Sequence, residues 1–145
     1  MPELLSTSPE NTFNIGVNWG LQAQKGWVLA LSGDLGAGKT QLIKGLAHGL
    51  GVSQIVKSPS FVLINIYTGG KLPLFHMDLY RLNSPDEIYT AGLDDYIARQ
   101  QGVCAIEWAE KWCDLKNYKP KLLRIVEIKV IGQSKRLIVY EDISN

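Results

Sequence analysis

The sequence has few cysteines, almost no net charge and no long uninterrupted apolar run. Its two cysteines, Cys104 and Cys113, lie nine residues apart, without a Cys-x-x-Cys motif or paired histidines. This pattern does not favour a disulfide or a zinc site, and we expect reduced thiols in or near the core of a cytoplasmic protein. A net charge of +1 provides no overall field for nucleic acid or anionic membranes, so such a partner would need a local patch.

The apolar segments are too interrupted for membrane insertion. The run Leu122–Ile131 is broken by charges, whereas a membrane span needs about 20 apolar residues. The start, Met1-Pro2-Glu3-Leu4, has no basic segment followed by an apolar one, so we expect no secretory signal. We therefore expect no membrane partner.

The remaining composition is typical of globular proteins. The chain has 145 residues, of which 46 % are hydrophobic and 20 % are charged. These values exclude disordered and fibrous classes, and the length suits one ordinary domain with a core of its own. We predict a single domain over residues 1–145.

Helical and strand patterns interleave along the chain. Predicted helices begin at Ser8-Pro9-Glu10, near Lys39, and at the capping box Ser84-Pro85-Asp86-Glu87. Predicted strands are 27–32, 61–67, 72–79, 103–106, 124–130 and 136–140. Residues 61–67 with 72–79, and 124–130 with 136–140, form hairpins. This order predicts an α/β fold of the P-loop NTPase kind, with a mixed central sheet, hairpins and flanking helices.

The first helix carries a second pattern. Phe13, Val17 and Leu21 recur at helical spacing, and Gly16 and Gly20 lie beside them. We expect these glycines to allow close packing against a neighbouring element.

Residues 32–42, SGDLGAGKTQL, place three glycines between a predicted buried strand and a predicted helix. Glycines let the backbone bring its N–H groups against phosphate oxygens, and the helix directs its positive end at the same anion. In this phosphate-loop pattern the Lys39 amine reaches the β and γ phosphates, and the Thr40 hydroxyl ligates Mg²⁺. The predicted nucleotide-binding residues are Gly33, Asp34, Leu35, Gly36, Ala37, Gly38, Lys39, Thr40 and Gln41.

The identity of the nucleotide base is indicated only by the absence of guanine-nucleotide motifs. A GTPase of the usual kind carries Asn-Lys-x-Asp and Asp-x-x-Gly motifs, and neither occurs here. We therefore favour ATP.

Two carboxylates at strand ends are candidates to complete the site. A Mg²⁺ ion needs a carboxylate, directly or through water, and an attacking water must be oriented. Glu107 ends a short strand that is apolar on both faces, as an inner strand would be, so we assign it to the metal. Asp78 ends an alternating strand and suits positioning of the γ-phosphate or of the water. Each could instead be a surface acid at a strand end.

Two neighbouring features are open to more than one interpretation. A lone histidine such as His76 is more often a hydrogen-bonded structural residue than a base. The hydroxyl-rich segment Val56–Phe61 is either a simple turn or a segment that senses the γ-phosphate.

Four strings, LSGDLGAGKT, VKSPSF, FHMDLYRL and AIEWAEKW, stand in the same order and at fitting intervals as in one known family. Together they resemble the TsaE (YjeE) family of bacterial ATPases, which are needed to make threonylcarbamoyladenosine in tRNA. The resemblance covers roughly residues 8 to 140, with Ser60 where the family usually has threonine.

The resemblance implies ATP as the nucleotide and slow hydrolysis by the isolated protein. In the family pattern, Thr40 and Glu107 hold Mg²⁺, Asp78 supports hydrolysis, and Glu110 also lies by the nucleotide. Lys39, Asp78 and Glu107 are then the catalytic residues. Thr12 and Arg136 sit where the family's first helix and last hairpin approach the base.

The resemblance also implies partners. These are the threonylcarbamoyl transferase subunit that modifies tRNA and its inactive paralogue, with tRNA itself met only indirectly. Basic residues gather in one segment together with Trp112 and Tyr118, namely Lys111, Lys116, Lys119, Lys121 and Arg124. This segment is either a solvated surface or a patch that meets RNA or the protein partner.

Two other functions remain open from the residues. A nucleotide-sensing adaptor would bind ATP without cleaving it. A small-molecule kinase would need an acceptor pocket and usually an arginine-bearing lid, for which the chain has little length left.

Overall fold

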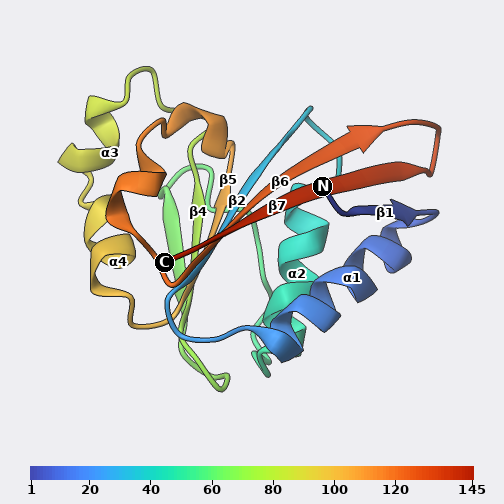
Figure 1. The fold of residues 1–145 in the computed structure, drawn as a ribbon, viewed down its shortest axis with the longest axis horizontal. Helices are drawn as coiled ribbons and strands as arrows, with labels where there is room; N and C mark the ends of the chain where they lie inside the picture. Colours follow the sequence, from blue (N-terminus) through green and yellow to red (C-terminus); the bar gives the residue numbers. More distant parts are fainter.

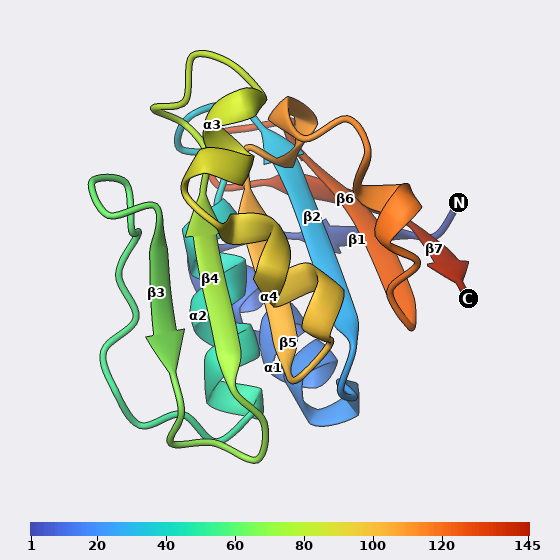
Figure 2. The same cartoon turned by 90° about the vertical axis from the view of Figure 1, so that its left-hand side faces the viewer.

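The chain folds around a seven-stranded mixed sheet with helices on both faces (Figures 1 and 2). The computed structural model describes all 145 residues. The strands are β1 (Glu3–Ser6), β2 (Trp27–Gly33), β3 (Ile64–Tyr67), β4 (Leu74–Asp78), β5 (Val103–Glu107), β6 (Leu122–Val130) and β7 (Arg136–Ser144). The helices are α1 (Pro9–Gln22), α2 (Lys39–Gly49), α3 (Asp86–Thr90) and α4 (Leu93–Arg99), with 3-10 turns η1 (Ala109–Lys111) and η2 (Leu115–Tyr118).

The sheet has a parallel centre and antiparallel edges. Its strand order is β1-β7-β6-β2-β5-β4-β3, and the four strands from β6 to β4 run parallel. The hairpins β3–β4 and β6–β7 and the pair β1–β7 are antiparallel. The predicted mixed sheet with hairpins and flanking helices is confirmed.

The parallel register brings three strand ends to one edge of the sheet. Glu107 on β5 pairs with Leu31 on β2 and with Asp78 on β4. Ligands of open parallel sheets bind outside the carboxyl ends of their strands. Asp78, Glu107 and the glycine loop that follows β2 therefore meet at one place.

Two apolar layers separate the sheet from its helices. Helices α1 and α2 cover one face, and α3, α4 and the 3-10 turns cover the other (Figure 2). The first layer contains Leu42 and Leu46 of α2, and the second contains Ile88 and Ile97 of α3 and α4. The apolar side chains of α2 thus fix this helix against the sheet, directly after the glycine loop.

Helices α1 and α2 contact each other through glycines. A Cβ atom added at Gly16 would lie 2.1 Å from the Leu42 carbonyl oxygen, and one at Gly45 would lie 1.9 Å from the Phe13 carbonyl oxygen. Gly20 and Gly49 form a second such contact one turn further along. The prediction of close packing at Gly16 and Gly20 is confirmed.

The buried face of α1 differs from the apolar spacing of its sequence. Its buried residues are Thr12, Gly16, Trp19 and Gly20, whereas Leu21 is 63 % exposed. The two helices meet backbone to backbone at the glycines, where the carbonyls of Phe13 and Val17 lie beside Gly45 and Gly49, and the side chains of Phe13 and Val17 are only partly buried.

The predicted strand 61–67 is wrong at its start. β3 begins at Ile64, because residues 60–63 form a turn in which the Leu63 N–H donates to the Pro59 carbonyl at 2.7 Å. Leu63 adopts a φ of +70°, which no regular strand allows. The turn projects Phe61 and Val62 into solvent, at 82 % and 63 % exposure.

Two other expectations need correction. Strand β1 was not predicted, because its four residues form an edge strand that pairs only with β7, which lies far away in the sequence. The thiols also differ: Cys104 is buried, which raises the pKa of its thiol to about 12, whereas Cys113 is exposed rather than in or near the core. Neither cysteine forms a disulfide.

No helix in the chain combines the length and the apolar character that crossing a bilayer requires.

The glycine contact between α1 and α2 should make Gly45 intolerant of a side chain. Gly45→Ala is expected to lower the free energy of unfolding by about 1–3 kcal/mol, because the new methyl group must push two backbones apart. Urea unfolding measures this, with Lys44→Ala on the exposed face of α2 as the control, expected to change stability by less than about 0.5 kcal/mol. A Gly45→Ala variant that is as stable as the wild type would contradict the packing.

Candidate functional site

The glycine loop joins β2 directly to α2. Gly36 and Gly38 adopt φ values of +79° and +112°. A Cβ at Gly36 would meet nothing within 4 Å. Glycine is therefore favoured at this position by the positive φ and not by a close contact. Gly38, in the left-handed conformation, is the N-cap of the eleven-residue helix α2. Because glycine has no side chain to accept a hydrogen bond, the first N–H groups of the helix stay open toward the loop. Such an arrangement is suited to an anion.

Lys39 is a buried cation whose present partners are neutral. Its side chain donates from Nζ to the carbonyl oxygens of Gly33 at 2.5 Å and Asp34 at 3.0 Å, and Nζ lies 4.0 Å from the Trp108 ring centroid. Burial lowers the pKa of Lys39, and the nearby carboxylates of Glu107 and Glu110 oppose that shift. An anion in the loop could replace these carbonyls as the partner of the amine.

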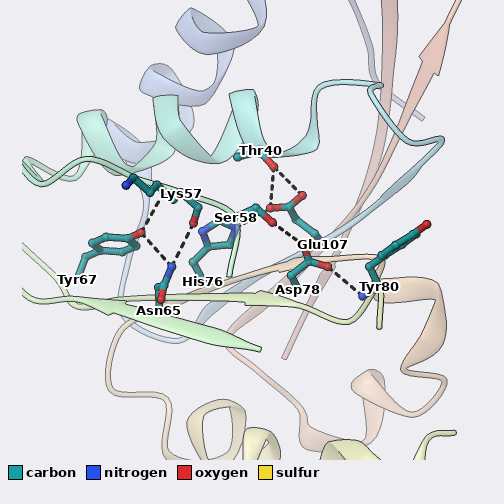
Figure 3. Close-up of polar contacts among 9 residues, drawn as sticks. All are labelled: Thr40, Lys57, Ser58, Asn65, Tyr67, His76, Asp78, Tyr80 and Glu107. Atoms are coloured by element: carbon teal, nitrogen blue, oxygen red, sulfur yellow. Dashed lines mark hydrogen bonds and ion pairs between the residues drawn. The ribbon is translucent and has the colours of Figure 1, made fainter. Parts of the chain in front are cut away.

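Glu107 stands between α2 and β4 (Figure 3). The Thr40 hydroxyl donates to Glu107 Oε1 at 2.8 Å and to Oε2 at 3.0 Å, and His76 Nε2 lies 2.6 Å from Oε2. Glu107 is only 3 % exposed and His76 is fully buried. The interpretation of His76 as a hydrogen-bonded residue is therefore consistent with its contact, and its partner is the candidate metal ligand itself.

Asp78 connects the site to the segment 56–61. The Ser58 hydroxyl donates to Asp78 Oδ2 at 2.6 Å, and the Tyr80 N–H donates to Oδ1 at 2.9 Å (Figure 3). Asp78 is 4 % exposed. The segment is thus held at Ser58 by a carboxylate at the end of β4, and at Lys57 by hydrogen bonds with Asn65 and Tyr67 of β3.

These side chains border one cavity of about 440 Å³. Predicted residues that line it are Leu35, Gly36, Gly38, Lys39, Thr40, Gln41, Asp78 and Glu107. Residues that the sequence analysis did not single out are Tyr80, Arg81 and Trp108. They follow Asp78 and Glu107 in the strings FHMDLYRL and AIEWAEKW, and that adjacency is the signal that could have found them.

A second cavity of about 240 Å³ lies on the other side of the loop. It is lined by Thr12 and Arg136, together with Gly36, Ala37 and Gly38. Arg136 Nε donates to the Ala37 carbonyl at 3.0 Å, which ties the last hairpin to the loop. The structure therefore brings Thr12 and Arg136 to the loop from opposite ends of the chain.

Three of the predicted residues do not line either cavity. Gly33 and Asp34 contribute the carbonyl oxygens that hold Lys39. Glu110 is exposed and borders two neighbouring hollows that η1 helps to line, although its carboxylate is close enough to oppose the lowering of the Lys39 pKa. Its place beside a nucleotide stays a prediction.

The basic segment 111–124 is only in part a free surface. Trp112 is 3 % exposed, and Arg124 pairs with Asp142 at 2.7 Å while its guanidinium packs among the rings of Trp19, Trp27 and Tyr140. Lys111 Nζ donates to two backbone carbonyls. A base could not stack on Trp112 without local unfolding, whereas Lys116, Lys119 and Lys121 are exposed, so only these lysines of the segment are open to a partner.

The contact between His76 and Glu107 should stabilise the fold. His76→Leu is expected to lower the free energy of unfolding by about 1–3 kcal/mol, because it leaves a buried carboxylate short of a donor. His76→Gln is expected to lose less, since its amide can donate from a similar position. Urea unfolding compares the two, with His48→Gln at the exposed histidine as the control. Equal stability of His76→Leu, His76→Gln and wild type would contradict the contact.

Comparison with known proteins gives one consistent result. The profile of the family described as "Threonylcarbamoyl adenosine biosynthesis protein TsaE" matches residues 6–138. The tRNA threonylcarbamoyladenosine biosynthesis protein TsaE of Bacillus subtilis is 42 % identical over 140 residues, which span 97 % of this chain and 85 % of that protein. The TsaE protein of Treponema pallidum is 36 % identical over 134 residues, which span 92 % and 96 % of the two chains.

A solved structure agrees with the sequence matches. The crystal structure of Bacillus subtilis YdiB superimposes with a TM-score of 0.78 and 38 % sequence identity, covering 99 % of this chain and 86 % of the other. The mixed sheet described above is therefore the fold of a relative as well. On these matches, which cover most of the chain at substantial identity, the protein belongs to the TsaE family.

Proposed function

We propose that this chain binds ATP with Mg²⁺ and hydrolyses it slowly, as a step in threonylcarbamoyladenosine modification of tRNA. The observation that carries the proposal is the convergence of Lys39, Thr40, Asp78 and Glu107 around one cavity at the amino end of α2. Three separate elements, α2, β4 and β5, supply these side chains. The whole chain would act as one ATPase domain.

The residues suit a magnesium ion. The Thr40 hydroxyl and the Glu107 carboxylate offer oxygen atoms within 3.0 Å of each other. Mg²⁺ prefers oxygen donors and is usually held by one or two protein groups plus water and phosphate oxygens. Thr40 and Glu107 would hold the ion, and when bound it would neutralise charge on the phosphates. His76 keeps the Glu107 carboxylate in position.

The remaining residues would position the nucleotide and water. Lys39 exchanges the Gly33 and Asp34 carbonyls for phosphate oxygens, and the loop N–H groups add further donors. Asp78, at the edge of the same cavity, orients the attacking water. Because Ser58 donates to Asp78, the segment 56–61 would sense whether the γ-phosphate is present.

The printed names of the relatives support the biological part of the proposal. They place TsaE proteins in tRNA threonylcarbamoyladenosine biosynthesis. We propose that this chain acts in the cytoplasm on the threonylcarbamoyl transferase subunit and its inactive paralogue, and meets tRNA only through them. ATP turnover would reset that assembly between rounds.

An adaptor that binds ATP without cleaving it is the second candidate. Both oxygens of Asp78 already accept hydrogen bonds, from Ser58 and from the Tyr80 N–H. A carboxylate that keeps both contacts would have less capacity to orient water.

Variants at Lys39 and Asp78 separate binding from turnover. Lys39→Ala should weaken ATP binding at least about tenfold, because it removes the charge-assisted contacts to phosphate. Asp78→Asn should keep ATP affinity within about threefold and lower the rate of phosphate release about a hundredfold. Titration calorimetry measures the first effect and a phosphate-release assay the second.

Lys44→Ala, on the exposed face of α2, is the matched control and should change neither quantity. Equal ATP affinity of Lys39→Ala and wild type would refute the assignment of the loop. A wild type that binds ATP but releases no phosphate would favour the adaptor.

A further inference from the structure

Arg81 is a cation of the cavity wall that the proposed site does not yet use. It follows Asp78 by three residues, is exposed, and lines the cavity. Its guanidinium carbon lies 4.0 Å from the ring centroid of Phe61, and the guanidinium forms no hydrogen bond or ion pair. All its N–H donors are therefore free for a ligand.

The backbone on both sides of Arg81 is held in place. The Tyr80 N–H donates to Asp78 Oδ1 at 2.9 Å, which anchors the chain before Arg81 to the strand edge. Lys111 Nζ donates to the carbonyl oxygens of Tyr80 at 2.6 Å and Leu82 at 3.0 Å, which anchors both neighbours. The backbone of Arg81 is thus fixed beside Asp78, and only its long side chain needs to change conformation to reach a ligand.

The charges around the cavity leave a place for such a cation. Lys39 and Arg81 are the basic residues of the lining, and Asp78 and Glu107 are the acidic ones. A bound nucleoside triphosphate would add negative charge to that of the two carboxylates. Mg²⁺ and Lys39 together would not neutralise this total. Phosphoryl transfer is accelerated by positive groups aimed at the charge that spreads over the γ-phosphate oxygens.

We propose that Arg81 is a catalytic arginine supplied by the chain itself, which leaves Phe61 and donates to the γ-phosphate oxygens in the transition state of hydrolysis. The inference rests on the proposed ATPase function. In that reaction a water oxygen bonds to the γ-phosphorus, and the bond to the β–γ bridging oxygen breaks with its electron pair leaving on ADP. The products are ADP, inorganic phosphate and a proton released to solvent.

Phe61 explains where Arg81 rests before catalysis. Phe61 is 82 % exposed and belongs to the turn that follows Ser58, whose hydroxyl is bound to Asp78. An exposed contact between a cation and an aromatic ring is weak, whereas a two-pronged contact between arginine and phosphate is strong. A γ-phosphate would therefore draw Arg81 off Phe61, which alters the turn next to the Ser58 contact.

The test compares a ground-state ligand with a transition-state mimic. Arg81→Ala should bind ADP with wild-type affinity within about threefold, and bind ADP with Mg²⁺ and aluminium fluoride at least about thirtyfold more weakly. Its rate of phosphate release at saturating ATP should fall by about 10²–10³-fold, and Arg81→Lys should recover only part of it. Arg99→Ala, at an exposed arginine of α4 that lies outside this cavity, is the matched control and should behave as wild type.

Three results would overturn the proposal. The first is an Arg81→Ala variant whose phosphate release and affinity for the fluoride complex equal those of the wild type. If Lys39→Ala still weakens ATP binding in that case, the ATPase function stands without Arg81. The second is equal weakening of ADP and of the fluoride complex, which would make Arg81 a general binding residue. The third is a wild-type chain that binds no ATP, which would remove the proposed function as well. Thermal unfolding of Arg81→Ala confirms that the variant is folded.

Discussion

The carboxylate of Glu107 is the group on which the arrangement of the site depends. Burying a carboxylate is costly unless donors surround it, and here the donors come from different elements. Thr40 lies in the first turn of α2, His76 lies within β4, and Glu107 itself ends β5. Satisfying this one group therefore fixes α2 against the edge of two strands. On its other side α2 is held by the glycine contact with α1, so the site and the core form one packing unit.

A second carboxylate links that rigid part to a more exposed one. Asp78 accepts hydrogen bonds from Ser58 and from the backbone of Tyr80, and the segments that carry those donors also carry Phe61 and Arg81. The turn at 60–63 is held by the Pro59 carbonyl and leaves Phe61 in solvent. A ligand that competes for Asp78 or Arg81 would thus alter the contacts of the exposed turn at 60–63. Such an arrangement can pass the state of a nucleotide to a partner protein.

Local patterns predicted the parts of the structure that local chemistry determines. Glycine spacing around Lys39 gave the loop, and apolar runs that end in acids gave Asp78 and Glu107, because parallel strands bring their ends to one edge. Features that depend on distant pairing, or on the conformation of a particular turn, were not predictable in this way. β1 exists only because β7 lies beside it. Phe61 belongs to an apolar run, yet the carbonyl of Pro59 turns it out of the sheet. Arg81 and Trp108 line the cavity because the chain turns there after the strands, and only their place directly after Asp78 and Glu107 in the sequence pointed to them.

If, as we propose, a nucleotide cycle in this site serves a protein assembly, the rate of that cycle should respond to the assembly. The most direct measurement is the rate of phosphate release by the purified chain with ATP and Mg²⁺, alone and with the purified transferase subunit and its paralogue. We expect a slow rate for the chain alone and a rate that changes when both partners are present. A rate of zero in both conditions, with ATP still bound, would contradict turnover and leave only nucleotide sensing.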